Sequence, residues 1–196
     1  MLQGYDTLTV RQEVEMLQVF TGLETRNRYR VMDSGGQDVL YAYEESGTLS
    51  RLFLQTHRPL TLHLIDGTGR TVLTGRREFF WFFSHLHFYS EEGREMGSLQ
   101  RRFKFINRCF DLTDAEGSYL HVDGPIYRPN TFWLRHSGGD LAKITKRWSG
   151  LSREAVSVAD TFEVEFTDRT MPESMRWLVL GAAFAIDLDF FEKKGR

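Results

Sequence analysis

Short apolar or alternating runs recur along the chain, and turns rich in glycine and polar residues separate them. The turns lie at 33–36, 66–69, 92–97, 113–117 and 136–140. Glycine beside polar residues is typical of tight turns, because glycine adopts positive φ at little cost. The runs that flank these turns are short enough for strands, so the pattern predicts a series of antiparallel hairpins.

The segment 7–20 fits two different structures. Val10, Val14 and Leu17 are spaced as on one face of a helix. Thr7, Thr9 and Val10 instead fit a strand that then bends. Both structures stay open on the sequence alone.

The C-terminal segment has the pattern of a helix that is apolar nearly all round. Pro172 and Glu173 favour a first helical turn, and 177–186 follows as ten uncharged residues. These features predict a helix from Met175 to Phe190. Crossing a bilayer takes about 20 such residues, so we expect this helix to be buried in the protein core. A helix wrapped by hairpin strands gives a mainly β fold, a closed antiparallel barrel with one buried helix.

Composition narrows the functional classes. The chain has 196 residues, of which 41% are hydrophobic and 27% charged, which suits one globular domain over 1–196. The net charge of −2 argues against nucleic acid as the expected partner. Cys109 is the single cysteine, so no intramolecular disulfide and no cysteine-based zinc cluster is expected. No signal peptide is visible, and we expect a cytoplasmic protein.

Two C-terminal stretches, "GGDLAKITKRWSGLSREAVSVADTFEVEF" and "LGAAFAIDLDFFEKKG", resemble the phospholipid scramblase family. Upstream, "LQVFTGLETRNRYRVMDSGGQDVLYAYEES" and "RPLTLHLIDGTGRTVLTGRR" resemble that family's opening block and next hairpin. The resemblance covers 8–192. It implies a tubby-like fold, a closed barrel of about twelve antiparallel strands around a central C-terminal helix.

The resemblance also implies a function. Scramblases are named for calcium-triggered, ATP-independent movement of phospholipids between leaflets. We therefore expect membrane-associated phospholipid binding or transbilayer phospholipid movement, with the protein peripheral on the inner face of the plasma membrane. The alternative is a soluble, non-enzymatic tubby-like module that binds a lipid headgroup or a protein partner. The animal relatives' cysteine-rich runs and proline-rich extension have no counterpart, so we expect a minimal member of the family, such as a bacterial one.

A block of five aromatic residues occupies a place where animal relatives carry acylatable cysteines. On a strand, alternate residues would face opposite sides, so three would point into the core and two outward. The outward pair, Phe80 and Phe82, would need a cover. That cover is either the N-terminal segment or a subunit partner, or else a membrane, whose interface favours Trp and Phe. We hypothesise membrane contact by the whole block, Phe79, Phe80, Trp81, Phe82 and Phe83.

A short basic and aromatic cluster follows the last turn, and it could contact anionic headgroups. Strand alternation offers a plainer explanation, with Ile144 inward and the lysines in solvent. The cluster consists of Lys143, Lys146, Arg147 and Trp148.

The family's acidic, calcium-related stretch is incomplete in this sequence. Its first acidic place is Val158 and its third is Asp160, while the twelfth falls on Arg169 or, with a shift, on Asp168. Calcium needs several oxygen ligands, so Asp160 alone makes calcium a doubtful cofactor. Nearby acids alternate with apolar residues at 162–166, as on a half-buried strand with its acids in solvent.

The remaining polar groups predict no enzyme site. His85 and His87 share a strand face, but no acid or cysteine has a matching ligand spacing. His136, Ser137 and Asp140 fall within one polar turn, and no nucleophile elbow or phosphate-binding loop is present. We therefore expect a protein with no catalytic residues.

Overall fold

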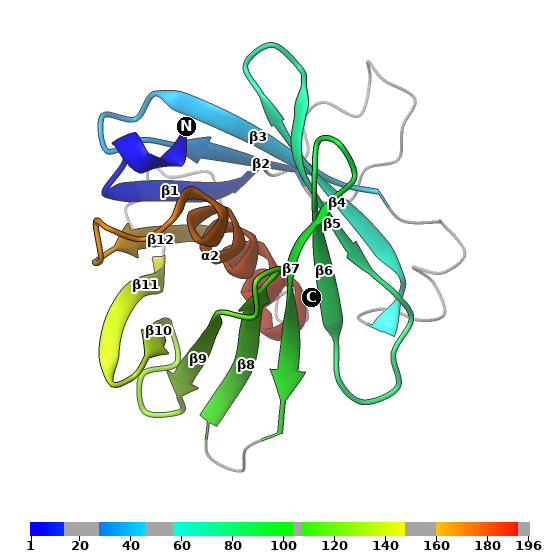
Figure 1. Ribbon diagram of the computed structural model, residues 1–196, viewed down its shortest axis with the longest axis vertical. Coiled ribbons are helices and arrows are strands. Elements are labelled where there is room, and N and C mark those ends of the chain that lie inside the picture. The colour runs from blue at the N-terminus through cyan, green and yellow to red at the C-terminus, as the bar shows by residue number, and fades with distance from the viewer. Residues whose placement is uncertain (14–27, 46–56, 104–106, 148–159, 192–196) are drawn as a thin grey trace, which may run out of the picture.

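The computed structural model describes residues 1–13, 28–45, 57–103, 107–147 and 160–191. Twelve antiparallel strands form a closed barrel in which each strand pairs with its neighbours along the chain (Figure 1). β1 and β12 pair with each other and complete the ring. The strands are β1 (Thr7–Glu13), β2 (Arg28–Met32), β3 (Asp38–Glu45), β4 (Leu60–Asp66), β5 (Thr71–Arg77), β6 (His85–Ser90), β7 (Glu95–Arg102), β8 (Asn107–Asp114), β9 (Tyr119–Pro125), β10 (Thr131–His136), β11 (Gly139–Arg147) and β12 (Thr161–Phe166).

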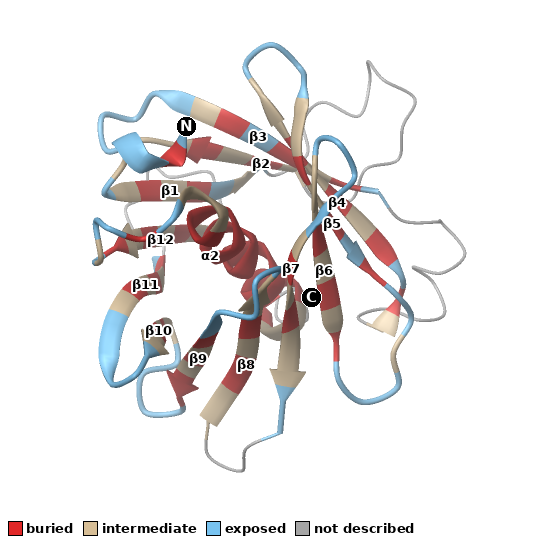
Figure 2. Ribbon diagram, viewed as in Figure 1, coloured by how far each residue is buried: buried red, intermediate tan, exposed pale blue. Residues whose placement is uncertain are grey.

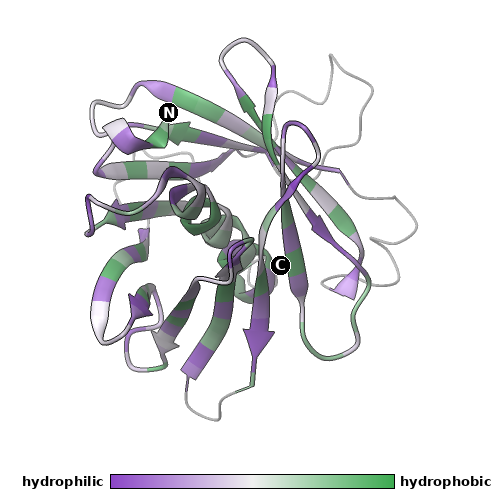
Figure 3. Cartoon of the chain, in the orientation of Figure 1, coloured by the Kyte–Doolittle hydropathy of each residue, from purple (hydrophilic) through white to green (hydrophobic). Residues whose placement is uncertain are grey.

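The alternating pattern of the sequence explains why these segments form a barrel. Buried and less buried positions alternate along the strands (Figure 2), and apolar residues occupy the inward positions (Figure 3). On β12, Phe162, Val164 and Phe166 are buried while Glu163 and Glu165 are not. A side-chain period of two gives each strand one apolar face, and closure gives that face a common core. The predicted closed twelve-stranded barrel is therefore confirmed.

The C-terminal helix occupies the centre of the barrel, as predicted (Figure 1). α2 (Glu173–Ile186) is continued by η3 (Asp187–Phe191), a π-helical stretch. Every residue of α2 from Met175 onward is buried. Among the described residues, no helix combines the length and apolarity that a membrane crossing requires.

The start of α2 is fixed to the N-terminal segment, which contains η1 (Leu2–Gly4). The Glu173 carboxylate accepts the Leu2 backbone N–H at 2.7 Å and lies 2.7 Å from the N-terminal amine. The buried Arg176 guanidinium donates to the Tyr5 carbonyl at 2.8 Å. These contacts join the first residues of the chain to its last helix.

β1 resolves the first part of the ambiguous segment 7–20 as a strand, and 14–20 lies outside the described residues. The turn at 136–140 joins β10 to β11, as the sequence predicts. Its two central residues have positive φ, 49° at Ser137 and 86° at Gly138. Left-handed backbone at both centres matches the twist of a two-residue hairpin.

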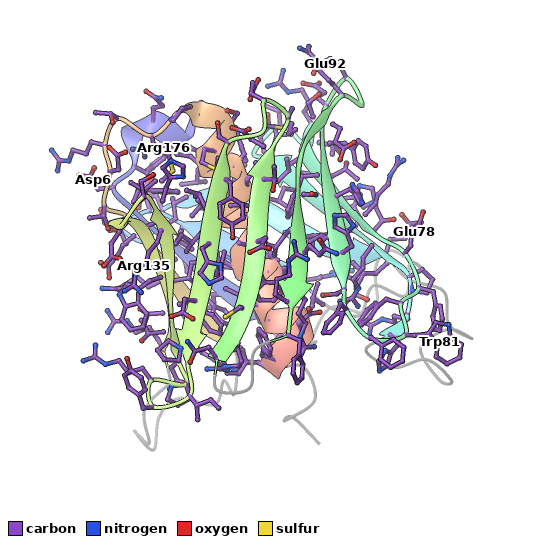
Figure 4. All side chains as sticks on the ribbon, turned by 60° about the horizontal axis from the view of Figure 1, so that its bottom comes forward. Asp6, Glu78, Trp81, Glu92, Arg135 and Arg176 are labelled. Carbon is purple, nitrogen blue, oxygen red and sulfur yellow. The ribbon has the colours of Figure 1, made fainter. Side chains whose placement is uncertain are left out.

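Up-and-down connectivity places alternate connections at opposite ends of the barrel. One end, here called the polar end, carries the turns 33–37, 67–70, 91–94, 115–118 and 137–138. The other, here called the aromatic end, carries the connections that follow β5, β7 and β9. In Figure 4, Glu92 and Trp81 mark these two ends. α2 begins at the polar end beside Leu2, and η3 reaches the aromatic end.

Candidate functional site

The five-aromatic block is a loop and not a strand. β5 ends at Arg77 and β6 begins at His85, where the two strands pair through Arg77 and Leu86. The chain reverses between them, so the block has no ladder to impose alternation. The predicted inward positions of Phe79, Trp81 and Phe83 are therefore wrong. Their exposed fractions are 38%, 78% and 45%, and Phe82 reaches 82%.

Phe80 alone in the block packs back onto the barrel, which again reverses the predicted orientation. Its backbone N–H donates to the His57 carbonyl, and its own carbonyl lies 3.0 Å from Nδ1 of His57. The two rings are 4.9 Å apart between centroids. The Arg77 guanidinium lies 5.2 Å from the Phe80 ring centroid. Phe80 thus fixes the loop while its neighbours project into solvent.

The two ends of this loop are bound by one carboxylate of η3. Asp189 Oδ1 accepts from Nη1 of Arg77 at 2.9 Å, and Oδ2 accepts from the Ser84 hydroxyl. The side chains of Arg77 and Asp189 are each only 2% exposed, and Ser84 is 4% exposed. Burial raises the pKa of Asp189, and the Arg77 charge and the Ser84 hydrogen bond oppose that rise. The loop therefore has a fixed base and an exposed tip.

Two neighbouring connections add apolar side chains to the same end. Phe103 is 67% exposed, and its ring centroid lies 6.4 Å from that of Phe83. Ile126 and Tyr127, in the connection after β9, are 58% and 80% exposed. Sequence reasoning missed these three residues. The order of the predicted strands could have revealed them. In an up-and-down barrel every second connection lies at the same end, so the connections after β5, β7 and β9 lie together.

The aromatic end gathers most of the exposed large apolar side chains in the described part of the chain. Seven of the ten lie there, and the others are Met1, Tyr41 and Tyr119. Figure 4 shows Trp81 directed away from the barrel at this end. The seven are Phe79, Trp81, Phe82, Phe83, Phe103, Ile126 and Tyr127.

Arginines accompany this apolar surface. Arg108 is half-buried, donates to the Pro129 carbonyl and lies 4.8 Å from the Phe132 ring centroid. Burial lowers the pKa of Arg108. Arg102 and Arg128 are exposed near the ends of β7 and β9. In the turns of the polar end, acids outnumber arginines, with Asp33, Glu91, Glu92 and Glu116 against Arg70 and Arg94.

The basic cluster at 143–148 does not act as one surface. Lys143 and Arg147 face outward and pair with Glu165 at 2.8 Å and Glu163 at 2.6 Å. Lys146 faces inward and is only 6% exposed, so its predicted exposure is wrong. The reason is parity, because Lys146 lies two residues after the inward Ile144. Trp148 lies outside the described residues.

Lys146 forms an ion pair with Asp160, the carboxylate considered for calcium. Its Nζ lies 2.5 Å from Oδ2 of Asp160 and 3.9 Å from the Phe191 ring centroid. Asp168 accepts from the Thr170 backbone N–H within a turn. Arg169 pairs with Asp6 at 2.6 Å. Val158 lies outside the described residues. Within 160–169, each acidic side chain contacts a cationic side chain or a hydrogen-bond donor of a turn.

The paired histidines lie on the outer wall and share a face as predicted. The ring centroids of His85 and His87 are 4.0 Å apart. Nδ1 of His87 lies 2.8 Å from Oε1 of Glu95. Burial lowers the pKa of His85, and the neighbouring His87 lowers it further.

Comparison with known proteins gives a consistent family assignment. The family model described as "Scramblase" matches residues 1–193. Phospholipid scramblase 1 of Mus musculus is 32% identical over 99% of this chain and 63% of its own length. The Homo sapiens protein of the same name is 28% identical over 99% of this chain and 65% of its own length.

A fungal relative carries a different name. Altered inheritance rate of mitochondria protein 25 of Saccharomyces cerevisiae is 23% identical over 97% of this chain and 72% of its own length. The chain spans a little under two thirds of the mouse and human relatives. No solved structure shows significant similarity to the chain.

Proposed function

The chain belongs to the scramblase family, and from that premise we propose that it binds phospholipid membranes through the aromatic end of its barrel. The observation that carries the proposal is the exposure of Trp81 and Phe82, 78% and 82%, on a loop with a fixed base. Burying one such side chain contributes roughly 1.5–3 kcal/mol. Trp and Phe favour the membrane interface.

The surrounding charges favour one orientation and one class of lipid. Arg102, Arg108 and Arg128 outnumber Glu78, the acid in the connections at the aromatic end, whereas acids outnumber arginines in the turns of the polar end. Anionic lipids attract basic residues close to a surface at about 1 kcal/mol each. We infer an end-on orientation on anionic membranes, with the polar end away from the lipid. Anionic lipids line the cytoplasmic leaflet, so the proposed location is peripheral, on the inner face of the plasma membrane.

The proposed activity is phospholipid binding or phospholipid movement between leaflets, without covalent chemistry. Family membership supports the lipid as ligand, and the aromatic loop supplies the contact. The relatives named phospholipid scramblase support movement as the finer form of the activity. If the protein does not bind membranes, the alternative function is that of a soluble tubby-like module that binds a protein partner.

Sedimentation with liposomes tests the contact surface. The variant Trp81→Ser with Phe82→Ser should keep the fold, since both side chains are exposed, and should lower co-sedimentation several-fold. Tyr41→Ser is the control, because Tyr41 is also exposed but lies on the β3 wall. If the double variant pellets like the wild type, this surface is not the membrane contact.

Vesicle composition tests the charge argument and the activity. Arg128→Gln should weaken binding to phosphatidylserine-containing vesicles about fivefold and leave binding to phosphatidylcholine vesicles nearly unchanged. Reconstitution with labelled lipid, with and without calcium, then measures transbilayer movement. Binding without movement would limit the function to lipid binding, and no pelleting with either vesicle would exclude both forms.

A further inference from the structure

Four side chains of metal-ligand type form a square block on the outer wall of the barrel. Cys109 and Asp111 are two residues apart on β8, so they share a face. Across the ladder, Cys109 is paired with Asp123 and Asp111 with His121. Directly opposite residues have Cβ atoms roughly 4.5–5.5 Å apart. The register of β8 and β9 therefore brings together groups that are separated by 10 to 14 residues in sequence.

Three of these groups already converge. The donor atoms of Cys109, His121 and Asp123 all lie within 4.8 Å of one another. The Cys109 thiol donates to Oδ1 of Asp123 at 3.3 Å. Cys109 is buried, whereas His121 and Asp123 are half-buried and reach solvent. The block is thus open on one side and walled on the other.

Neighbouring side chains hold these groups in place. Asn107 Nδ2 donates to Oδ1 of Asp123 at 2.8 Å. Nδ1 of His121 lies 3.2 Å from Oδ1 of Asp111, which also accepts from the Tyr119 hydroxyl at 2.6 Å. Partners that orient a ligating imidazole or carboxylate are typical of metal sites.

We propose that Cys109, His121 and Asp123 bind a divalent cation of the zinc type, with water in the fourth position. Sulfur, nitrogen and one carboxylate oxygen in a four-coordinate arrangement suit zinc, whereas calcium takes six to eight oxygens. Binding replaces the thiol proton, which leaves to solvent, by the metal–sulfur bond. The thiolate and the carboxylate together balance the two positive charges.

Nearby arginines explain why Asp123, and not Asp111, is the carboxylate that would bind the metal. Arg102 is bound to Asp111 and keeps that carboxylate engaged. Nη1 of Arg135 lies 3.9 Å from Oδ2 of Asp123, but its Nε is 2.5 Å from Asp140 (Arg135 is labelled in Figure 4). Asp123 therefore keeps an oxygen for the metal, and Asp111 serves to orient His121.

The site lies on the wall near the aromatic end, and it shares one neighbour with the proposed membrane contact, because Arg102 pairs with Asp111. Its two strands lead directly to that end, β8 from Phe103 and β9 to Ile126. A bound cation would cross-link β8 and β9 close to where those connections begin.

Cobalt titration of the metal-stripped full chain tests the proposal. Cobalt(II) should give tetrahedral visible bands and a thiolate charge-transfer band, release one proton per ion, and be displaced by zinc. Cys109→Ala should abolish the charge-transfer band. Both Cys109→Ala and His121→Gln should weaken cobalt binding at least about tenfold. Loss of a residue that only supports a metal ligand already costs about that much affinity. His87→Gln is the matched control, an outer-wall histidine paired with Glu95, and should bind as the wild type does.

The same titration can overturn the proposal. An octahedral cobalt spectrum without a thiolate band, or equal affinities in wild type, Cys109→Ala and His121→Gln, would exclude the site. Thermal melting of each variant without metal separates folding from binding. Should Cys109→Ala fail to fold, the cobalt affinities of His121→Gln and Asp123→Asn test the site instead. Both side chains are half-buried on the outer wall, so these substitutions do not alter the core.

Discussion

Arg77 and Asp189 form a buried ion pair in which Nη1 and Oδ1 are 2.9 Å apart and each side chain is 2% exposed. The pair joins the base of the aromatic loop to the last turns of the central helical segment. Asp189→Asn should destabilise the protein by about 3–5 kcal/mol, because the buried Arg77 guanidinium would lose the charge of the Asp189 carboxylate. Urea unfolding at pH 7 measures this change.

The exposed pair Arg30–Asp38 provides the comparison for that experiment. Asp38 accepts hydrogen bonds from Nε and Nη2 of Arg30 on the exposed surface of the barrel. Asp38→Asn should therefore change the urea midpoint far less than Asp189→Asn. Equal stabilities for Asp189→Asn and the wild type would mean that the buried pair does not hold the loop.

Gly181 allows the central helix to approach the strand that carries Phe88. A Cβ at position 181 would lie 2.4 Å from Cε1 of Phe88, whose ring is fully buried. Gly181→Ala should cost about 1–3 kcal/mol through overpacking, although alanine is the better helix former. Gly181→Leu should cost more, and a thermal or urea melt gives both values.

A compensating change distinguishes overpacking from other effects of the Gly181 substitution. Phe88→Leu removes the ring that the new Cβ meets, so Gly181→Ala should cost less in that background. Gly4→Ala serves as the control, because nothing lies within 4 Å of its added Cβ. A Gly181→Ala cost that Phe88→Leu leaves unchanged would rule out the ring contact as its cause.

The Lys146–Asp160 contact should prevent tight calcium binding. Nζ of Lys146 lies 2.5 Å from the carboxylate that a calcium ion would need. Isothermal titration should show no calcium binding tighter than about millimolar, the weak end of protein calcium sites. Asp160→Ala should instead lower stability by about 1–3 kcal/mol, because the buried Lys146 ammonium would lose its contact with this carboxylate. A micromolar calcium affinity lost in Asp160→Ala would show that the carboxylate serves the metal.

Burial of His85 should make stability fall as the solution becomes more acidic. Its pKa lies below the ordinary value of 6.5, so the unfolded chain takes up the proton first. The contribution of neutral His85 to the free energy of unfolding is fully present above pH 6.5. It is lost as the pH falls through the lowered pKa of His85 in the folded state. His85→Gln should flatten this part of the urea-midpoint profile. His136→Gln, at the exposed end of β10, is the control and should follow the wild type. Matching profiles for all three proteins would exclude His85 as the source.

The barrel and its central helix could be predicted because both depend on local patterns. Alternation on strands such as β12 and the uncharged run at 177–186 each require a buried face, whatever the partner. The aromatic block was misread because alternation was assumed where no strand pairing exists. Lys146 was misread although its parity with Ile144 was visible in the sequence.

Other features require the register of the strands or the full path of the chain. Arg77 and Asp189 are 112 residues apart in sequence, and only the closed barrel brings them together. Cys109 and Asp123 become neighbours only when β8 and β9 are aligned. Phe103 and Ile126 look like isolated apolar residues until the connections are assigned to one end of the barrel.

The pairing of β1 with β12 has a consequence for biosynthesis. The strand made first must wait for the strand made last, and the helix that fills the interior is translated after both. Emerging hairpins therefore have no core to pack on while the ribosome is still elongating. Contacts so distant in sequence slow folding, so the barrel closes only after β12 and α2 have been synthesised, and the apolar faces of the earlier strands are open to aggregation until then.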